Sequence, residues 1–230
     1  MDLPWSGPSL AHVRALMDET AGDEKHDPSA LSVLDVTWLL YDRVLRHDPG
    51  NPRHERRDRF LVSKGHGPLA LYSVLAAWGY FPEAELATFM ARGSRLGGHP
   101  DRNLVPGVEI STGSLGQGVP MAVGVALALR AKGSEGHVFV LLGDGEANEG
   151  SVWESLLAAG SLGIGNLTAI LIDNHTSTPA LGDLTVKFEA FGWAAQSIRS
   201  NDHATLESAL RLREPGRPTA VVVDWRPEWS

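Results

Sequence analysis

Residues 141–150, LLGDGEANEG, place a carboxylate between two glycines at the end of an apolar run. A second apolar run, LTAILID, ends directly before Asn174, thirty residues after Asp144. If the two runs are neighbouring strands of a parallel sheet, both polar side chains emerge at the same edge. A carboxylate, an amide oxygen and a nearby backbone carbonyl form a hard oxygen site that suits Mg²⁺ or Ca²⁺. Such a cation would bridge to a diphosphate, and Gly143 and Gly145 would let the backbone approach it closely.

The same residues also have a purely structural interpretation. Gly-Asp-Gly is common in turns, and an asparagine often stabilises a loop. His66 and His99 lie beside glycines, where a histidine usually makes structural hydrogen bonds. Spacing alone therefore leaves a turn and a cation site as open alternatives.

The second half of the chain alternates between two periodicities. Short apolar, β-branched runs predict strands, and amphipathic runs between them predict helices. Alternating strands and helices are typical of an α/β fold with a parallel sheet flanked by helices. The strands are expected over 137–142, 167–173, part of 188–200 and 218–225, and the helices over 151–163 and 204–214.

The first 130 residues are expected to be mainly helical, with glycine-rich joints. Ser29 is a candidate N-cap for the first of these helices. The expected helices cover 29–47, 67–81, 82–92 and 116–133. No internal repeat, low-complexity tract or linker divides the sequence, so residues 1–230 are predicted to form one domain.

Composition restricts the classes of function. The chain has 230 residues, of which 43% are hydrophobic and 21% charged, as in one large globular domain. A formal net charge of −8 argues against general affinity for nucleic acid or an anionic membrane. The absence of cysteine excludes disulfides and thiolate metal sites and fits a cytoplasmic protein. We find no signal peptide and no apolar run approaching the roughly 20 residues of a membrane span.

Several longer motifs resemble one enzyme family. GDGEANEGSVWES followed by IDNHTS resembles the thiamine diphosphate fingerprint. DRFLVSKGHGPLALYSVLAAWGYFP, SRLGGHPDRNLVPGVEISTGSLGQG and FEAFGW resemble the N-terminal, diphosphate-binding part of transketolase. The resemblance extends from about residue 10 to 224 and is closest to the split form, in which this part is a separate chain. It implies the diphosphate-binding domain of the thiamine diphosphate-binding fold.

The resemblance implies how a cation and the diphosphate are held. Asp144 and Asn174 would ligate Mg²⁺, with Ca²⁺ as the alternative. The backbone carbonyl of Thr176 would complete the ligands from the protein. Gly143 and Gly145 would let the loop close on the diphosphate.

Four further residues take roles near the reacting atoms by the same resemblance. His66 of SKGHG and His99 of GGHP match histidines around the diphosphate and the substrate carbons that react. Gly113 and Leu115 of STGSLGQG match the segment that lies against the aminopyrimidine of the cofactor.

The resemblance also implies a partner. A glutamate in a separate pyrimidine-binding domain normally completes the active site, and we find no such domain in this sequence. We therefore expect a C-terminal transketolase-like subunit to supply both, in an α₂β₂ assembly, and the chain alone to be inactive. Glu149 and Glu154 match acids of the network that links two active sites, although the first turns of a helix also favour acids. The small-residue helix over 116–132 and the EGSVWES helix are the candidate interfaces.

Three departures from the family affect the substrate. AGDEKHDPSALS, with His26, replaces a Ser-Gly-His-Pro-Gly-like motif. After Asn174 the chain has His175 in place of glycine, and the following loop is shorter. The sequence stops at VVVDWRPEWS, where the family normally continues. A remodelled entrance suggests an unusual donor or acceptor in a specialised pathway, such as secondary metabolism.

Three functions remain open on this evidence. The leading one is transfer of a two-carbon ketol unit from a ketose donor, with a sugar phosphate or related small molecule as substrate. The second is acyl transfer from a 2-oxo acid such as pyruvate on the same cofactor. The third is a non-catalytic regulatory homologue, which the altered ends favour and the intact Asp144, Asn174, His66 and His99 oppose.

Overall fold

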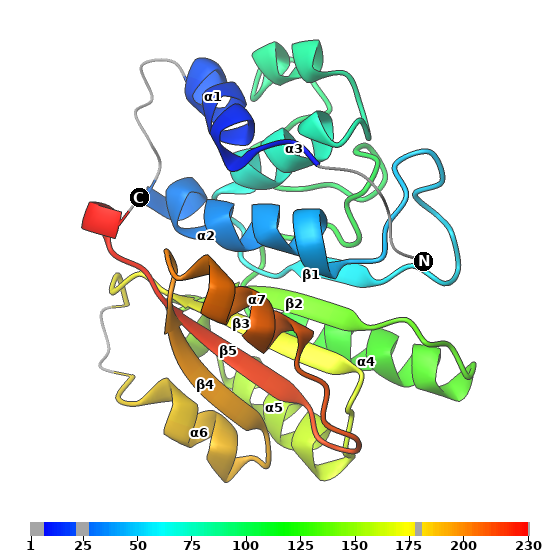
Figure 1. Cartoon of the computed structure of the whole chain (residues 1–230), viewed down its shortest axis with the longest axis vertical. Coiled ribbons are helices and arrows are strands. Elements are labelled where there is room, and N and C mark those ends of the chain that lie inside the picture. Colours follow the sequence, from blue (N-terminus) through cyan, green and yellow to red (C-terminus); the bar gives the residue numbers. More distant parts are fainter. Residues whose placement is uncertain (1–6, 22–27, 178–180, 230) are drawn as a thin grey trace.

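Five parallel strands form the centre of the protein, seen in a computed structural model that describes residues 7–21, 28–177 and 181–229. The strands lie in the order β1-β2-β3-β5-β4, and each neighbouring pair is parallel (Figure 1). Their bounds are β1 Arg59–Val62, β2 Val138–Gly143, β3 Leu167–Asp173, β4 Ala194–Arg199 and β5 Thr219–Asp224. The predicted parallel α/β sheet is confirmed.

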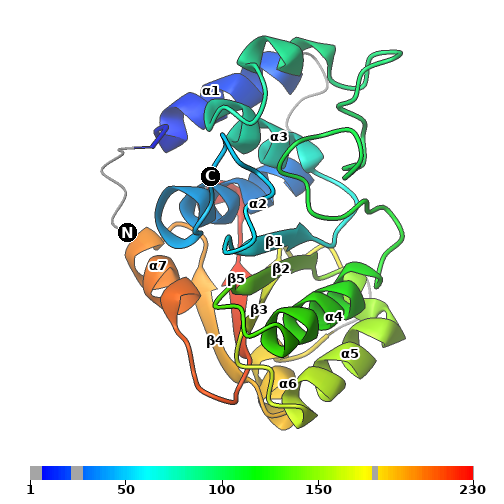
Figure 2. The same ribbon diagram turned by 90° about the vertical axis from the view of Figure 1, so that its right-hand side faces the viewer.

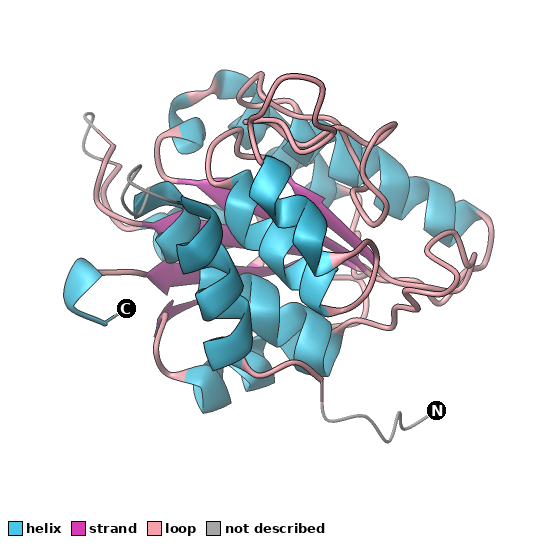
Figure 3. Cartoon of the chain, turned by 90° about the horizontal axis from the view of Figure 1, so that it is seen from above, coloured by secondary structure: helices cyan, strands magenta, loops and turns pink. Residues whose placement is uncertain are grey.

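Helices cover both faces of this sheet. Helices α1, α2, α3 and α7 share one core, and α4, α5 and α6 share the other (Figures 1 and 2). Seen from above, the strands lie between helices (Figure 3). The helices are α1 Leu10–Ala21, α2 Pro28–Leu39 with a π-helical turn Leu40–Val44, α3 Pro68–Ala77, α4 Gly118–Ala131, α5 Gly150–Ser161, α6 Leu184–Ala190 and α7 His203–Arg211. Short 3₁₀ turns cover Glu83–Thr88, Glu146–Asn148 and Pro227–Trp229.

The strands explain the apolar runs in the sequence. In β2, Phe139 and Leu141 face the core under α2 and α3, and Val138, Val140 and Leu142 face the core under α4 and α5. Successive side chains of a strand point to opposite faces, so a strand covered on both sides has no polar face. All six residues of β2 are buried.

Strand β1 was not predicted. Its run RFLV is four residues long and begins with an arginine, which gave no signal in a region dominated by helical patterns. It pairs with β2 in the register Phe60↔Phe139 and Val62↔Leu141. The strand matters because it brings the SKGHG segment to the same sheet edge as Asp144.

Two local predictions in the helical half were wrong. The helix expected over 82–92 is only the 3₁₀ turn Glu83–Thr88, because the chain folds back at Met90, which has a left-handed φ of 57° and donates its N–H to Leu96. Ser29 lies inside α2 and is not its N-cap, since Pro28 already occupies the first helical position, which suits proline. The remaining predicted helices and strands are present with ends shifted by a few residues. Within the described ranges, no helix is long and apolar enough to cross a membrane.

A buried polar chain crosses the amino end of the sheet. The His137 ring lies 2.8 Å from the Thr168 hydroxyl, which lies 2.7 Å from the Thr219 hydroxyl. All three residues are buried. Burial lowers the pKa of His137 to about 2, and the nearby Arg213 and Arg46 act in the same direction. The folded protein therefore holds this imidazole neutral.

This histidine should make stability depend on pH. Its folded pKa of about 2 lies below the value of about 6.5 in an unfolded chain, so its contribution is complete above pH 6.5 and is lost as pH falls toward 2. We expect a slope of about 1.4 kcal/mol per pH unit in this window. Urea unfolding of His137→Gln between pH 7.5 and 5 should show a smaller slope than the wild type. The same change at the exposed His54 is the control, and equal slopes in wild type and His137→Gln would contradict the assignment.

Candidate functional site

Asp144 is fixed at the carboxyl edge of the sheet by four donors. It follows β2, is 3% exposed, and donates its own N–H to Ile172 at 2.9 Å. Its carboxylate accepts hydrogen bonds from the N–H groups of Gly145 (2.8 Å), Thr176 (2.8 Å) and Ser177 (2.9 Å). The Thr176 hydroxyl lies 3.3 Å from Oδ1. A buried carboxylate is thus held in one orientation by the loop that follows β3.

Asn174 lies beside this carboxylate, as expected for neighbouring strands. Strands β2 and β3 pair in the register Gly143↔Ile172, so they end in line. The Asn174 amide nitrogen lies 2.9 Å from Asp144 Oδ1 and 2.7 Å from the Thr176 hydroxyl. The structure therefore brings together Asp144, Asn174 and Thr176, which the sequence placed thirty residues apart.

His175 occupies the turn between Asn174 and Thr176. It has a left-handed φ of 59°, a conformation that favours glycine and is uncommon for histidine. Its N–H donates to Asp173 at 3.2 Å, and its ring nitrogen Nε2 lies 2.7 Å from Asp224. These two carboxylates hold the strained residue in place, so the turn that presents Thr176 is kept without glycine.

The residues at this edge suit a magnesium ion better than an all-protein metal cage. Among the described residues, no group of three His, Cys, Asp or Glu side chains could hold a metal ion. Mg²⁺ commonly uses one or two carboxylates together with ligand phosphates. A side-chain carbon added at Gly143 or Gly145 would meet no atom within 4 Å, so space for a ligand lies directly against the backbone. The donor set and this space fit a cation bound together with a diphosphate.

His66 and His99 come together in a second part of the site. Their rings lie 5.7 Å apart at 79°, and both residues are exposed. Gly113 lies against His99: an added carbon at Gly113 would lie 2.3 Å from His99 Cδ2, and its φ is +139°. Only glycine permits this approach, and Leu115 beyond it is 41% exposed. The structure thus places three of the predicted residues in contact around one opening.

Glu146 connects the loops that carry these groups. It is 2% exposed and lies two residues after Asp144 in the 3₁₀ turn. Its Oε1 accepts hydrogen bonds from the Ser63 hydroxyl (2.5 Å) and the Gly116 N–H (2.8 Å). Burial raises the pKa of Glu146, and the bonds from Ser63 and Gly116 oppose that shift. Ser63 leads to His66, and Gly116 follows Leu115, so one carboxylate joins three loops of the site.

Helix α5 fixes Gly116 from the other side. The Ser151 hydroxyl donates to the Gly116 carbonyl at 2.8 Å. Glu149 and Glu154 lie at the start of the same helix and are exposed. Their expected place in an interface is compatible with this exposure and stays a prediction.

Sequence reasoning missed Glu146, Ser63 and Ser151. Glu146 follows the Gly-Asp-Gly directly, but a partly acidic turn after a strand gives no sign of burial. The two serines would have needed β1 and the packing of Gly116 to be known. His26 lies outside the described residues.

Replacing Gly113 should disturb the histidine pair. Gly113→Ala would force the new methyl group against the His99 ring in a backbone conformation unfavourable for alanine, at a cost of about 2–4 kcal/mol. Urea unfolding measures the loss, and the imidazole resonances of His66 and His99 should shift. Gly124→Ala is the matched control, because it is exposed in α4 and an added carbon meets nothing within 4 Å. That variant should gain about 0.5–1 kcal/mol, and similar losses at both positions would refute the contact.

Comparison with known proteins gives consistent matches over most of the chain. Residues 10–224 match the family model described as "Transketolase, thiamine diphosphate binding domain". One of the subunits of apulose-4-phosphate transketolase from Actinobacillus succinogenes is 37% identical, covering 89% of this chain and 81% of that protein. The 6-deoxy-6-sulfo-D-fructose transketolase subunit SqwG of Clostridium sp. is 38% identical, with 86% and 76% covered.

A third relative is named "Ferredoxin fas2", from Rhodococcoides fascians. It is 44% identical over 210 residues, covering 90% of this chain and 69% of that protein. The present chain has no cysteine and thus no thiolate for an iron–sulfur cluster. Among solved structures, a transketolase from Pichia stipitis superposes with a TM-score of 0.87 at 28% identity, covering 94% of this chain and 35% of that one. The chain spans about a third of that longer enzyme.

Proposed function

Since the chain belongs to the transketolase family as a thiamine diphosphate-binding domain, we propose that the ends of β1, β2 and β3 hold thiamine diphosphate through Mg²⁺. The chain is the cofactor-binding subunit of a transketolase-like transferase. The observation that carries the proposed site is the contact between Asp144 and Asn174 beside open space at Gly143 and Gly145. A cation there would neutralise the buried carboxylate and the incoming diphosphate together.

Each residue of the chain has a defined part in this proposal. Asp144, the Asn174 amide oxygen and the Thr176 carbonyl hold the cation. Gly113 and Leu115 support the aminopyrimidine. When bound, thiamine diphosphate supplies the chemistry that breaks and forms the carbon–carbon bond.

His66 and His99 act on the substrate. Their rings are close enough to form hydrogen bonds to neighbouring oxygens of one small molecule. As donors they would stabilise negative charge on a carbonyl oxygen, and as acceptors they would take a hydroxyl proton. This assignment suits the proposed transfer of a two-carbon ketol unit from a ketose.

The substrates are proposed to be specialised sugars or sugar phosphates. Two relatives are named for apulose 4-phosphate and for 6-deoxy-6-sulfo-D-fructose, and neither is an ordinary pentose phosphate. Together with the remodelled turn at His175, these names favour a specialised pathway. The cytoplasmic location rests on the cysteine-free sequence alone.

A partner subunit would cover the outer surface of α4 and α5. Two relatives are named as single subunits of transketolases, which supports a divided enzyme. The two helices lie side by side (Figure 2) and expose Met121 (40%), Leu157 (50%) and Leu162 (52%). Gly124 and Ala128 add exposed small residues to α4. An apolar surface of this kind favours an interface, and we propose that it lies within an α₂β₂ assembly.

Cofactor binding tests the site directly. Calorimetry should show that thiamine diphosphate binds the complex with the partner only when Mg²⁺ is present. Asp144→Ala should weaken this binding at least tenfold, because a charge-assisted ligand contributes more than about 1.4 kcal/mol. Glu214→Ala, in an exposed turn far along the chain, is the control for the loss of one carboxylate.

The alternatives predict other outcomes. Binding without any cation would contradict the role of Asp144 and Asn174. The absence of binding to a correctly folded complex would favour a non-catalytic subunit. If the cofactor binds, product analysis with a phosphoketose and with pyruvate distinguishes ketol transfer from acyl transfer.

Assembly tests the surface of α4 and α5. Met121→Glu and Leu157→Glu place a charge on this surface and should prevent association with the partner subunit, measured by sedimentation. Leu212→Glu is the control, because Leu212 is 38% exposed but follows α7 on the opposite side of the sheet. Unchanged assembly of the first two variants would place the interface elsewhere.

A further inference from the structure

A cavity of about 960 Å³ lies beside β1, which is the edge strand of the sheet. The segment before β1, the segment 102–110 and Val125 of α4 form its walls. None of the residues assigned above to the cofactor, the cation or the substrate lines it. The cavity is therefore a separate feature that the proposed function does not use.

Positive charge is concentrated in this cavity. Four arginines and two glutamates line it, which leaves a formal charge of +2. The chain as a whole has a net charge of −8. The lining residues that carry charge are Arg53, Arg57, Arg59, Arg102, Glu55 and Glu109.

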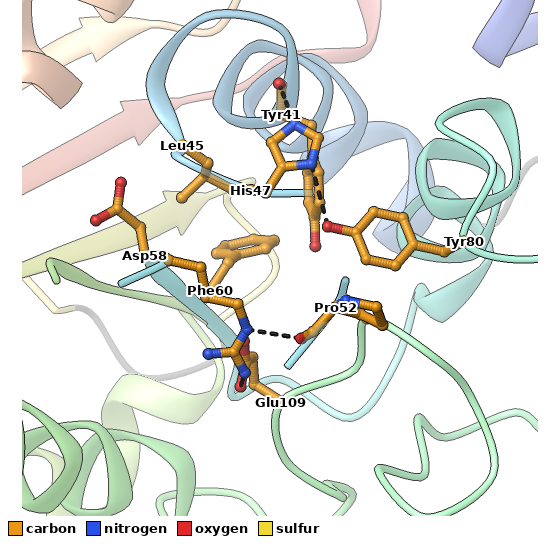
Figure 4. Close-up of a pocket in the computed structure, with 10 residues that line it drawn as sticks. Tyr41, Leu45, His47, Pro52, Asp58, Phe60, Tyr80 and Glu109 are labelled. Carbon is orange, nitrogen blue, oxygen red and sulfur yellow. Dashed lines mark hydrogen bonds and ion pairs between the residues drawn. The ribbon is translucent and has the colours of Figure 1, made fainter. Parts of the chain in front are cut away.

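Two of the arginines are already held by the protein. Arg57 donates to Glu109 at 2.8 Å and, through Nε, to the Pro52 carbonyl at 2.8 Å, the bond drawn at Pro52 in Figure 4. The Arg59 guanidinium donates only to backbone carbonyls, including that of Glu55 at 3.1 Å. Burial and the nearby charge of Arg57 lower the pKa of Arg59. Arg59 therefore contributes a positive charge that no carboxylate hydrogen-bonds.

The other two arginines have free donors. Within the described part of the chain, the guanidinium groups of Arg53 and Arg102 form no hydrogen bond and no ion pair, and both residues are exposed. Arg102 lies near enough to Glu109 to lower its pKa, although burial raises that pKa more. The Arg57–Glu109 pair thus forms a fixed wall, and Arg53 and Arg102 can turn toward a ligand.

We propose that this cavity binds the phosphate group of a small organic phosphate monoester. Guanidinium groups present paired donors that match phosphate oxygens. A phosphate monoester carries a charge of about −1.5 to −2, which balances the lining charge of +2. Apolar side chains, among them Val105, Val108 and Ile110, line the remainder of the cavity and suit the carbon part of such a ligand.

The position of the cavity gives its ligand access to the active site. Arg102 lies three residues after His99, and Ile110 lies three residues before Gly113. The wall 102–110 is therefore the chain that connects two residues of the proposed cofactor and substrate site. A ligand that bridges Arg53 and Arg102 would restrain this segment and so influence the contact between His99 and Gly113.

The test titrates inorganic phosphate into the ¹⁵N-labelled chain without cofactor or Mg²⁺. We expect saturable shifts of the arginine side-chain resonances of Arg53 and Arg102. Arg53→Gln and Arg102→Gln should each weaken binding about tenfold, the effect of losing one charge-assisted contact. Arg56→Gln is the matched control, because Arg56 is exposed in the same segment but does not line the cavity.

Two further measurements separate this site from others. Asp144→Ala should keep its phosphate affinity, so binding at the proposed diphosphate site would be recognised by its loss in that variant. The result is then independent of whether the proposed function is correct. Absence of saturable shifts in the wild type, or equal weakening in Arg56→Gln, would overturn the proposal. Binding of a hexaglutamate peptide but not of phosphate would also overturn it, in favour of an acidic segment of a protein.

Discussion

The buried carboxylate of Glu146 is the interaction on which the geometry of the site depends. Its Oε1 joins Ser63, at the end of β1, to Gly116, at the end of the segment expected to face the aminopyrimidine. Hydrogen bonds to a charged acceptor contribute about 1.5–3 kcal/mol each, and an unsatisfied buried donor has a comparable cost. Loss of this group would therefore free two loops at once. Among the described residues Oε2 has no hydrogen-bond partner, so a polar group of the assembled enzyme would be well accommodated there.

The sheet explains why one turn can reach so many parts of the site. Strands β1, β2 and β3 are parallel and adjacent, so the segments that follow them leave the sheet at one edge. The segment after β1 carries His66, the segment after β2 carries Asp144 and Glu146, and the segment after β3 carries Asn174. Helices on both faces bury the strands completely and leave only this edge and its loops to bind a ligand. The rigid core fixes the strand ends, and short polar contacts set the loops.

The sequence was sufficient for features that depend on local periodicity, and insufficient for those that depend on packing. Two apolar runs ending at Asp144 and Asn174 predicted their contact, because parallel neighbours have aligned ends. The resemblance of the longer motifs predicted the family. Strand β1 was missed because a short strand in a helical region has no periodic signal. The burial of Glu146 and the approach of Gly113 to His99 could not be predicted, since each requires segments far apart in the chain to be placed first. The arginines of the cavity are likewise separated in sequence, between residues 53 and 102.

The exposed parts of the site indicate why a second subunit is needed. Chemistry of this family benefits from excluding water, because hydrogen bonds to developing charge are stronger in a dry site. Here His66, His99 and Leu115 are all exposed, so the chain alone cannot provide such an environment. Helix α5 connects the two requirements physically. Its first turn binds the Gly116 carbonyl through Ser151, and its outer surface exposes Leu157 beside Met121 of α4. A partner docked on that surface would therefore close the site and, through Ser151, also hold the segment that supports the cofactor.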